Sequence, residues 1–408
     1  MPSRPSVTIS ETTVALILAC CFGTVMLDRM EQLFLGPDLE RGLHLSPSQI
    51  GLLAGAVSVC WALSTFVFGM VSDRVGRKRV LVPAMVVFSL LSWVSGLARN
   101  FEEMLLIRAL LGLAEGPCWS VIMATMEDLS TPERRGRNVG MVVCAGSLVG
   151  SAIGPVFATQ IAAHFGWQAA FFAAGIPGLI LAAVVARHVP EPARGPHAGP
   201  ASPSASLATA RAVLASRDLW LCFLAALMLT VWIFAFNAFA PLFMSQTKGF
   251  SGTQIGWILG ASGFGGFLYC LSWPALSDRI GRRPALLTAA VIATALPLGF
   301  LLPGLDARLL VPVAMLTSTG PAIAALAMVL VPMELAPGGQ TATAVGFVSI
   351  GGDALGATLG PVAGGYLVER FDLTAPLWLA AGAGVAIVLA CLFLRETRPN
   401  RLETAHPA

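Results

Sequence analysis

Ser72-Asp73-Arg74-Val75-Gly76-Arg77-Lys78-Arg79 is a short basic segment that follows a long apolar run, and the chain carries a second copy, Ser277-Asp278-Arg279-Ile280-Gly281-Arg282-Arg283. The copies lie 205 residues apart, about half of the 408-residue chain. A repeat of this length indicates two copies of one folding unit rather than a solenoid of short repeats. Because each copy follows an apolar run, the repeated unit is predicted to be a membrane bundle, which favours a transporter over an enzyme.

The composition indicates that the chain lies in a membrane. It is 56% hydrophobic and 12% charged, with a mean hydropathy of +0.78, whereas soluble domains carry roughly 25% charged residues. Each spanning helix needs about 20 apolar residues, so the length allows about twelve spans, and we expect an all-α membrane protein. The predicted spans are residues 12–35, 48–71, 80–98, 103–126, 138–163, 167–188, 219–245, 252–276, 285–303, 308–332, 341–368 and 374–394.

Basic residues are distributed unevenly between the two ends of the predicted spans. One end, together with the termini and the central linker, holds 18 of the 25 Lys and Arg residues, and the opposite end holds five. By the positive-inside rule, the first end is cytoplasmic. We therefore expect a multi-pass protein of a bacterial inner (plasma) membrane with both termini in the cytoplasm. The remaining two basic residues, Arg29 and Arg108, fall inside spans.

Two half-chains of the same orientation are predicted around a linker rich in Pro and Ser, which cannot bury apolar surface. The repeat includes Ser46 and Ser251, which are natural helix N-caps. It also matches Glu127 with Glu334 at the ends of the fourth and tenth spans. The predicted division is a bundle at residues 1–189, a cytoplasmic linker at 190–217 and a second bundle at 218–408.

The basic segment resembles the signature loop of the major facilitator superfamily. The first copy matches that loop at Gly69, Asp73, Arg74, Gly76, Arg77 and Arg79. The second copy keeps Asp278 and Arg279 but has Pro274 where the first glycine would align. The resemblance covers essentially the whole chain and implies two six-helix bundles that rock about a central site. It also implies that the loop charges form a latch that holds the bundles in one state; the alternative is simple anchoring of a cytoplasmic loop.

Six ionisable residues remain inside the predicted spans: Asp28, Arg29, Glu31, Arg108, Glu115 and Asp353. A charge in the membrane costs about 2.5–3.5 kcal/mol on insertion scales, so these residues are functional candidates. At about 1.5 Å per residue, Arg29 and Arg108 reach a similar depth in the outer half. Arg108 and Glu115 are two helical turns apart and share a face. Glu31 is closer to the outer end, where we expect an entrance group.

Two arginines beside several carboxylates suit the transport of an anion together with protons. An arginine fork binds a carboxylate through two parallel hydrogen bonds, and a carboxyl group in an apolar cavity can carry a proton near neutral pH. The five histidines lie in loops, at helix ends, or in the linker and tail. Proton binding is therefore expected at the carboxylates rather than at histidine.

A narrower resemblance is to the anion:cation symporter branch of the superfamily. It rests on Asp28-Arg29 in the first span and on the run from Arg108 through Gly112 to Glu115 in the fourth. The resemblance implies that Arg29 binds the substrate carboxylate and that Asp28 and Glu115 bind protons. Arg108 would line the same site and modulate Glu115. The alternatives are a local pair between Asp28 and Arg29 and a structural ion pair between Arg108 and Glu115.

The second half offers fewer candidates. Asp353 lies near the middle of the eleventh span. It is either a second proton site, a partner for a cationic group, or a residue hydrogen-bonded to a neighbouring helix. Trp232, Asn237 and Tyr269 are candidate substrate contacts, with ordinary helix packing as the alternative for each.

The leading hypothesis is secondary active transport, namely proton-coupled symport of a small organic anion, a monocarboxylate, by alternating access. The alternative is a proton-driven exporter of drugs or amphipathic metabolites, which rarely needs two buried arginines in the first half. We recognise no catalytic motif, cofactor loop or metal-ligand spacing, so we expect no enzyme activity, cofactor or metal. The expected partners are the anion, protons and the lipid bilayer, without nucleic acid, and the expected functional unit is a monomer. The eight cysteines are interpreted as small buried hydrophobes.

Overall fold

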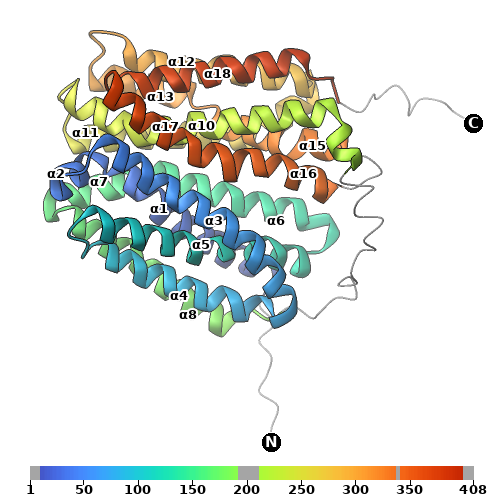
Figure 1. Cartoon of the computed structure of the whole chain (residues 1–408). Coiled ribbons are helices and arrows are strands. Elements are labelled where there is room, and N and C mark those ends of the chain that lie inside the picture. The colour runs from blue at the N-terminus through green and yellow to red at the C-terminus, as the bar shows by residue number, and fades with distance from the viewer. Residues whose placement is uncertain (1–9, 192–210, 337–340, 398–408) are drawn as a thin grey trace, which may run out of the picture.

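The computed structural model describes residues 10–191, 211–336 and 341–397. Within these ranges the chain is helical, without strands, and twelve helical segments are long and apolar enough to cross a membrane (Figure 1). The prediction of an all-α membrane protein with twelve spans is confirmed. Most of the predicted linker, residues 192–210, lies outside the described residues.

The first six spans form one bundle, which we call the N bundle. Its helices are α1 (Glu11–Phe34), α2 (Gly36–Leu43), α3 (Pro47–Val75), α4 (Arg77–Ser95), α5 (Phe101–Leu129), α6 (Pro132–Ala145), η1 (Gly146–Ile153), α7 (Gly154–Phe165) and α8 (Trp167–His188). Helix α3 packs along α5, and α4 packs against both α5 and α8. The short helix α2 lies beyond the end of α1.

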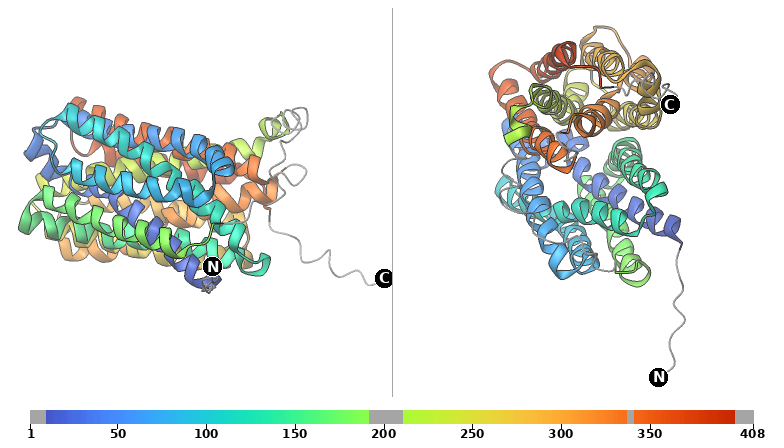
Figure 2. Two further views of the ribbon diagram at one scale, coloured as in Figure 1. Left: turned by 90° about the horizontal axis from the view of Figure 1, so that it is seen from below. Right: turned by 90° about the vertical axis from the view of Figure 1, so that its right-hand side faces the viewer.

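The last six spans form the C bundle. Its helices are α10 (Arg217–Gln246), α11 (Gly252–Ile280), α12 (Arg282–Leu301), α13 (Ala307–Thr317), α14 (Gly320–Ile323), η2 (Ala324–Leu330), α15 (Val331–Leu335), α16 (Thr341–Ser349), η4 (Ile350–Gly356), α17 (Ala357–Arg370) and α18 (Ala375–Phe393). Helix α18 packs against α10 and α12. Viewed along the helices, the blue-to-green and yellow-to-red groups lie side by side as two bundles (Figure 2).

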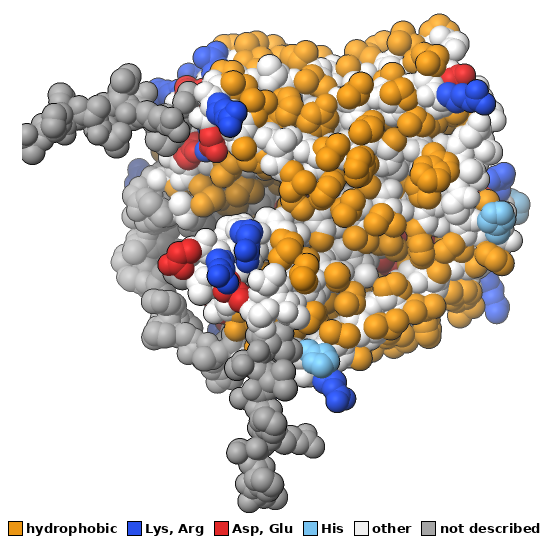
Figure 3. All heavy atoms as spheres, turned by 180° about the vertical axis from the view of Figure 1, so that it is seen from behind, with side chains coloured by type: hydrophobic (Ala, Val, Ile, Leu, Met, Phe, Trp, Pro, Cys, Tyr) orange, Lys and Arg blue, Asp and Glu red, His pale blue; other side chains and the backbone are white. Residues whose placement is uncertain are grey.

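The flank of the molecule is apolar, as a lipid-facing surface requires. Figure 3 shows hydrophobic side chains over the flank, while Lys, Arg, Asp and Glu gather toward the two ends. Large exposed side chains such as Phe66 and Phe165 belong to the spans. A soluble protein would not expose such a continuous apolar surface.

Local sequence signals repeat in the structure of both halves. Ser46 accepts a hydrogen bond from the backbone N–H of Gln49, whose side chain in turn accepts one from the backbone N–H of Ser46. Ser251 and Gln254 form the same reciprocal cap on α11. These capping boxes confirm the expected N-caps.

Three spans contain a widened, π-helical segment that the sequence pattern did not indicate. Segment η1 lies in the fifth span, η2 in the tenth and η4 in the eleventh. The starts of η1 and η4 are 204 residues apart, so they occupy equivalent positions in the repeat. Such segments often occur at functional sites, and η4 contains Asp353.

The two bundles are in contact mainly toward the end where α2 lies, which we call the α2 end. A buried apolar core there includes Leu33 and Ile50 of the N bundle together with Phe239 and Ile255 of the C bundle. A second core, which includes Phe88, lies within the N bundle. We call the opposite end, which carries the two Asp-Arg loops, the basic end.

Backbones approach closely at the α2 end. A Cβ added to Gly51 would lie 2.2 Å from the carbonyl oxygen of Pro361, and one at Gly365 would lie 2.6 Å from that of Pro47. The backbone N–H of Ser48 donates to Glu369 of the C bundle at 3.1 Å. In this conformation, therefore, the α2 end is closed.

One polar contact across the closed end joins α2 to α10. The side-chain amide of Gln246 donates to Glu40. Burial raises the pKa of the Glu40 carboxyl, while the Gln246 hydrogen bond and the charge of Arg41 oppose that shift. The contact is one more link between the bundles at this end.

Candidate functional site

Helix α1 places three of the predicted candidates in the interior of the N bundle. Asp28 and Glu31 are fully buried, and Arg29 is 6% exposed. Helix α5 brings Arg108 and Glu115, both fully buried, to the same region. Glu31, expected near an entrance, is fully buried while the α2 end is closed, so its role there stays a prediction.

Small residues on α5 permit a close approach to α3, as the sequence suggested. A Cβ at Gly112 would lie 2.4 Å from the carbonyl oxygen of Val57. At Gly116 it would lie 2.0 Å from the hydroxyl of Ser64. Ser64 donates to the carbonyl of Gly112 at 3.2 Å. These two helices therefore pack closely beside the buried charges of α5.

Arg108 is held without a direct ion pair. Its three guanidinium nitrogens have no hydrogen-bond partner, and its Cζ lies 4.5 Å from the centre of the Phe171 ring on α8. Its charge interacts with Asp28, then Glu31, then Glu115, in decreasing order. Within the described residues, no ion pair of 4.0 Å or less includes Arg108, so the alternative of a structural pair with Glu115 is not realised here.

Arg29 lies between the bundles. Its Cζ is 4.1 Å from the ring centre of Trp61 on α3 and 5.6 Å from that of Phe234 on α10. Its Nε has no hydrogen-bond partner, and its charge interacts with Glu115 and with Asp353 of the C bundle. A local ion pair with Asp28 is not formed within 4.0 Å in the described part of the chain.

The aromatic contacts of Arg29 were not found by sequence reasoning. Neither Trp61 nor Phe234 was among the site residues predicted from the sequence. Cation–π contacts of this kind join residues from three different helices. No spacing along the chain reveals them.

Asp353 faces Arg29 from the other bundle. It lies in η4 and is solvent-accessible, although it is halfway along a membrane-spanning segment. Its charge interacts with that of Arg29. Accessibility at this depth, together with the interaction with Arg29, indicates that Asp353 faces the space between the bundles.

The three predicted contacts in the C bundle differ in their surroundings. Trp232 is buried, stacks on Phe236 with ring centres 6.1 Å apart, and has an indole N–H without a partner. Asn237 donates to the carbonyl of Ile233 at 2.8 Å, and Tyr269 donates to that of Leu316 at 2.7 Å. Only Trp232 keeps its polar group unused in this conformation.

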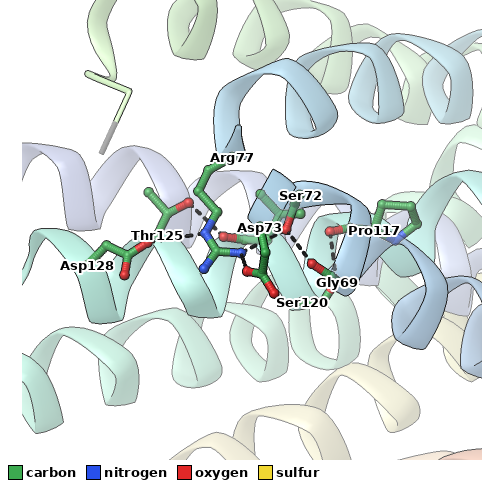
Figure 4. A network of polar contacts seen from close by, with 9 residues as sticks. Gly69, Ser72, Asp73, Arg77, Pro117, Ser120, Thr125 and Asp128 are labelled. Carbon is green, nitrogen blue, oxygen red and sulfur yellow. Dashed lines mark hydrogen bonds and ion pairs between the residues drawn. The ribbon is translucent and has the colours of Figure 1, made fainter. Parts of the chain in front are cut away.

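At the basic end, the first Asp-Arg loop forms a compact network within the N bundle (Figure 4). Arg77 pairs with Asp73, donates to Ser72 at 2.8 Å, and reaches Asp128 on α5 at 3.1 Å. Ser72 in turn donates to the carbonyl of Gly69 at 2.8 Å. Arg77 thereby ties the loop to α5.

The second loop repeats this network in the C bundle. Arg282 pairs with Asp278 at 2.7 Å and with Glu334 at 2.9 Å. The structural counterpart of Glu334 is therefore Asp128 and not Glu127, which pairs with Arg135 instead. The sequence match was one residue out of register at this point.

Both loops turn on a glycine and are capped by a carboxylate that sequence reasoning missed. Gly76 and Gly281 have φ of +119° and +105°, which favours glycine. Glu191 accepts from the backbone N–H of Lys78 at 3.1 Å at the start of α4. Glu396 accepts from that of Arg282 at 2.8 Å at the start of α12. These contacts join each loop to the segment that follows the last helix of its own bundle.

The cysteines only partly follow the expectation. Four are buried, but Cys20 is exposed and three are partly exposed. Cys144 of the N bundle and Cys270 of the C bundle lie with their sulfur atoms 3.8 Å apart. No pattern in the sequence predicted that two cysteines from different halves would meet.

The comparisons with known proteins agree with this architecture. A solved structure of a nucleoside transporter shares the fold with a TM-score of 0.77 at 17% identity, covering 93% of this chain and 99% of that one. A probable 4-methylmuconolactone transporter of Cupriavidus pinatubonensis is 30% identical over 391 residues, covering 91% of this chain and 87% of the relative.

A second relative is the 3-(3-hydroxy-phenyl)propionate transporter of Escherichia coli. It is 26% identical over 416 residues and covers 97% of both chains. The family model of the Major Facilitator Superfamily matches residues 17–353. This chain therefore belongs to the major facilitator superfamily, as a multi-pass membrane transporter and not an enzyme.

Proposed function

We propose that the protein imports a small organic acid, a monocarboxylate, together with protons by alternating access. The observation that carries the proposal is the environment of Arg29. Its guanidinium lies between the bundles against the faces of Trp61 and Phe234, with no carboxylate at ion-pair distance among the described residues. A substrate carboxylate would supply the missing partner through two hydrogen bonds.

The aromatic faces around Arg29 favour a planar or ring-bearing acid. A ring whose carboxylate binds Arg29 can stack against Trp61 or Phe234, which adds contact area and an aromatic interaction. The relatives named for 4-methylmuconolactone and 3-(3-hydroxy-phenyl)propionate support this class. The unpartnered indole N–H of Trp232 is a candidate donor to a second polar group. The roles of Asn237 and Tyr269 stay predictions.

Proton coupling would use the buried carboxylates. Asp28 and Glu115 have no hydrogen-bond partner and no exposure. Water does not compensate a change of charge at Asp28 or Glu115, because both are buried. Protonation of either carboxylate therefore changes its interaction energy with the neighbouring buried charges. Arg108, which interacts with both, would transmit a change at one carboxylate to the other. Asp353 would act on Arg29 from the C bundle.

The distribution of basic residues favours a bacterial inner membrane with the basic end and both chain termini in the cytoplasm. The closed α2 end would then face outward. We further propose division into bundles at 1–189 and 218–408 with a linker at 190–217, and a monomer as the working unit. Gly69, Arg74, Gly76 and Arg279 would shape the latch with the paired aspartates Asp73 and Asp278.

The proposal is tested by uptake into proteoliposomes that contain the purified protein. The probes are labelled 3-(3-hydroxyphenyl)propionate and 4-methylmuconolactone, each competed by its own unlabelled acid or by the neutral methyl ester. Competition by the acids but not by the esters is expected. Equal competition by the esters would contradict the proposal that Arg29 binds the substrate carboxylate. Protection of cells against amphipathic drugs, without acid uptake, would favour the exporter.

A further inference from the structure

Glu31 is a buried carboxylate to which the proposed mechanism gives no task. It lies on α1 three residues after Asp28, which places both on one face of the helix. Its side chain is fully buried, and neither carboxylate oxygen has a hydrogen-bond partner. It is also the carboxylate of the cluster that lies farthest along α1 toward the α2 end.

The charged neighbours of Glu31 are Asp28 on its own helix and Arg108 on α5. The charge of Asp28 repels that of Glu31, and the charge of Arg108 attracts it. Helix α1 also packs against α2, α3, η1, α6, α7, α8 and α10. Among the described residues, including the charged Asp38, Glu40 and Arg41 of α2, no further group acts on the charge of Glu31. Glu31 therefore has no dedicated positive partner.

The charges of the interior cluster do not balance. Three buried carboxylates, Asp28, Glu31 and Glu115, stand against two guanidinium groups, Arg29 and Arg108, so full ionisation leaves one surplus negative charge, and Asp353 opposite Arg29 adds a second.

The interactions also indicate which carboxylate is in surplus. The charge of Arg29 acts on Glu115 and on Asp353 but not on Glu31, and Arg108 is shared by Asp28, Glu31 and Glu115. Glu31 is the remaining group, in a place where an uncompensated charge is strongly disfavoured.

We propose that Glu31 is a further proton-binding residue of this transporter, which holds a proton while the α2 end is closed and exchanges it with the medium when that end opens. The proton adds to a carboxylate oxygen of Glu31 and leaves from it, with no other bond made or broken. This inference rests on the proposed proton coupling and adds a residue to it. Glu31 is the first carboxylate of the cluster that a proton entering from the α2 end would reach.

Infrared spectroscopy of the purified full-length protein tests the protonation directly. Protonated carboxyl groups absorb separately from carboxylates. Glu31→Gln should remove one deuterium-sensitive carboxyl band at neutral pH, and Glu31→Asp should restore a band at a shifted position. The matched control is Glu102→Gln, which makes the same change at an exposed position at the start of α5. An unchanged carboxyl region in Glu31→Gln would overturn the proposal.

The melting temperature gives a second readout, and it stays informative if Glu31→Gln folds poorly. Glutamine has nearly the shape of a protonated glutamate, so the melting temperature of Glu31→Gln should equal or exceed that of the wild type. A large fall would mean that Glu31 is ionised and held by Arg108, which also overturns the proposal.

Transport separates this inference from the proposed function. The number of protons per substrate, from the reversal potential in proteoliposomes, should fall in Glu31→Gln while substrate exchange is retained. An unchanged number of protons per substrate would reject the proton exchange proposed for Glu31 but not proton coupling as a whole. A wild-type protein without substrate-dependent proton flux would reject proton coupling itself, while the infrared result would still report the protonation of Glu31.

Discussion

At the scale of single residues, the buried arginines are stabilised by ring faces and by longer-range charge interactions rather than by ion pairs. Arg29 lies against Trp61 and Phe234, and Arg108 lies over Phe171. An arginine is less strongly hydrated than a lysine and stacks readily on aromatic rings. Such an arginine can stay charged in the interior and still present its N–H groups to an incoming anion.

Arg29→Lys is therefore expected to weaken substrate binding strongly, because an ammonium group cannot reproduce either the planar fork or the stacking. Hydrogen bonds to charged groups contribute about 1.5–3 kcal/mol, which corresponds to a loss of affinity of roughly ten- to a hundredfold. Equilibrium binding of the acid to detergent-solubilised protein measures this. Arg308→Lys, at an exposed position, is the control. Wild-type affinity in Arg29→Lys would refute the assignment.

The identity of the ionisable residues in the spans could be predicted from sequence, but their partners could not. Charges in an apolar run are conspicuous, and helix spacing places Arg108 and Glu115 on one face. Which ring stacks on which guanidinium depends on how three helices come together. Glu31 is likewise fully buried although it lies only three residues before the end of α1.

At the scale of helices, glycines set the contact between the bundles. Gly51 on α3 lies so close to α17 that an added Cβ would be 2.2 Å from the carbonyl oxygen of Pro361. A backbone atom cannot move aside as a side-chain tip can. This contact therefore belongs specifically to the conformation in which the α2 end is closed.

Gly51→Ala should favour opening of the α2 end. Overpacking costs about 1–3 kcal/mol, which shifts a two-state equilibrium by roughly 5- to 150-fold. The measurement is the labelling rate of single cysteines placed in the space between the bundles, using reagents added from the α2 side. Gly252→Ala is the control, because no atom lies within 4 Å of its added Cβ. Equal labelling in both variants would mean that this contact does not control closure.

The loop at the basic end supports a further prediction. Asp73→Asn removes one partner of Arg77 but leaves the ion pair of Arg77 with Asp128. The fold of the N bundle should therefore persist. In the proposed latch, Asp73 helps to hold the basic end closed in the opposite conformation, so its loss should shift the equilibrium toward opening of that end and slow transport. Cysteine labelling from the basic side measures the shift, with Glu127→Gln as the control. Unchanged labelling with normal transport would contradict the latch and would mean that the loop serves only to orient the protein in the membrane.

Helix boundaries followed from hydropathy and caps, whereas the π-helical segments did not. The twelve predicted spans overlap the twelve observed ones because apolar length is written directly in the sequence. A π-helical turn depends on packing against neighbouring helices, as for η1 against α1. Asp353 could be recognised as unusual from its sequence, but its position opposite Arg29 could not.

At the scale of the whole molecule, two bundles of similar fold meet at one interface but differ in the charged residues that they carry. The N bundle supplies Arg29 and Arg108 with the carboxylates Asp28, Glu31 and Glu115, and the C bundle supplies Asp353 and aromatic side chains. Closure at the α2 end brings Arg29 within range of Phe234 and Asp353. Because protons and the substrate anion would act on the same buried charges, binding of one should affect binding of the other.

The most direct test is uptake of labelled 3-(3-hydroxyphenyl)propionate and 4-methylmuconolactone into proteoliposomes under an imposed pH gradient. The wild-type protein should accumulate at least one acid above its equilibrium concentration and lose this ability when an ionophore collapses the gradient. Asp28→Asn and Glu115→Gln should retain exchange of labelled for unlabelled acid but lose accumulation. Accumulation that persists without the gradient, or in both variants, would contradict coupling through these buried carboxylates.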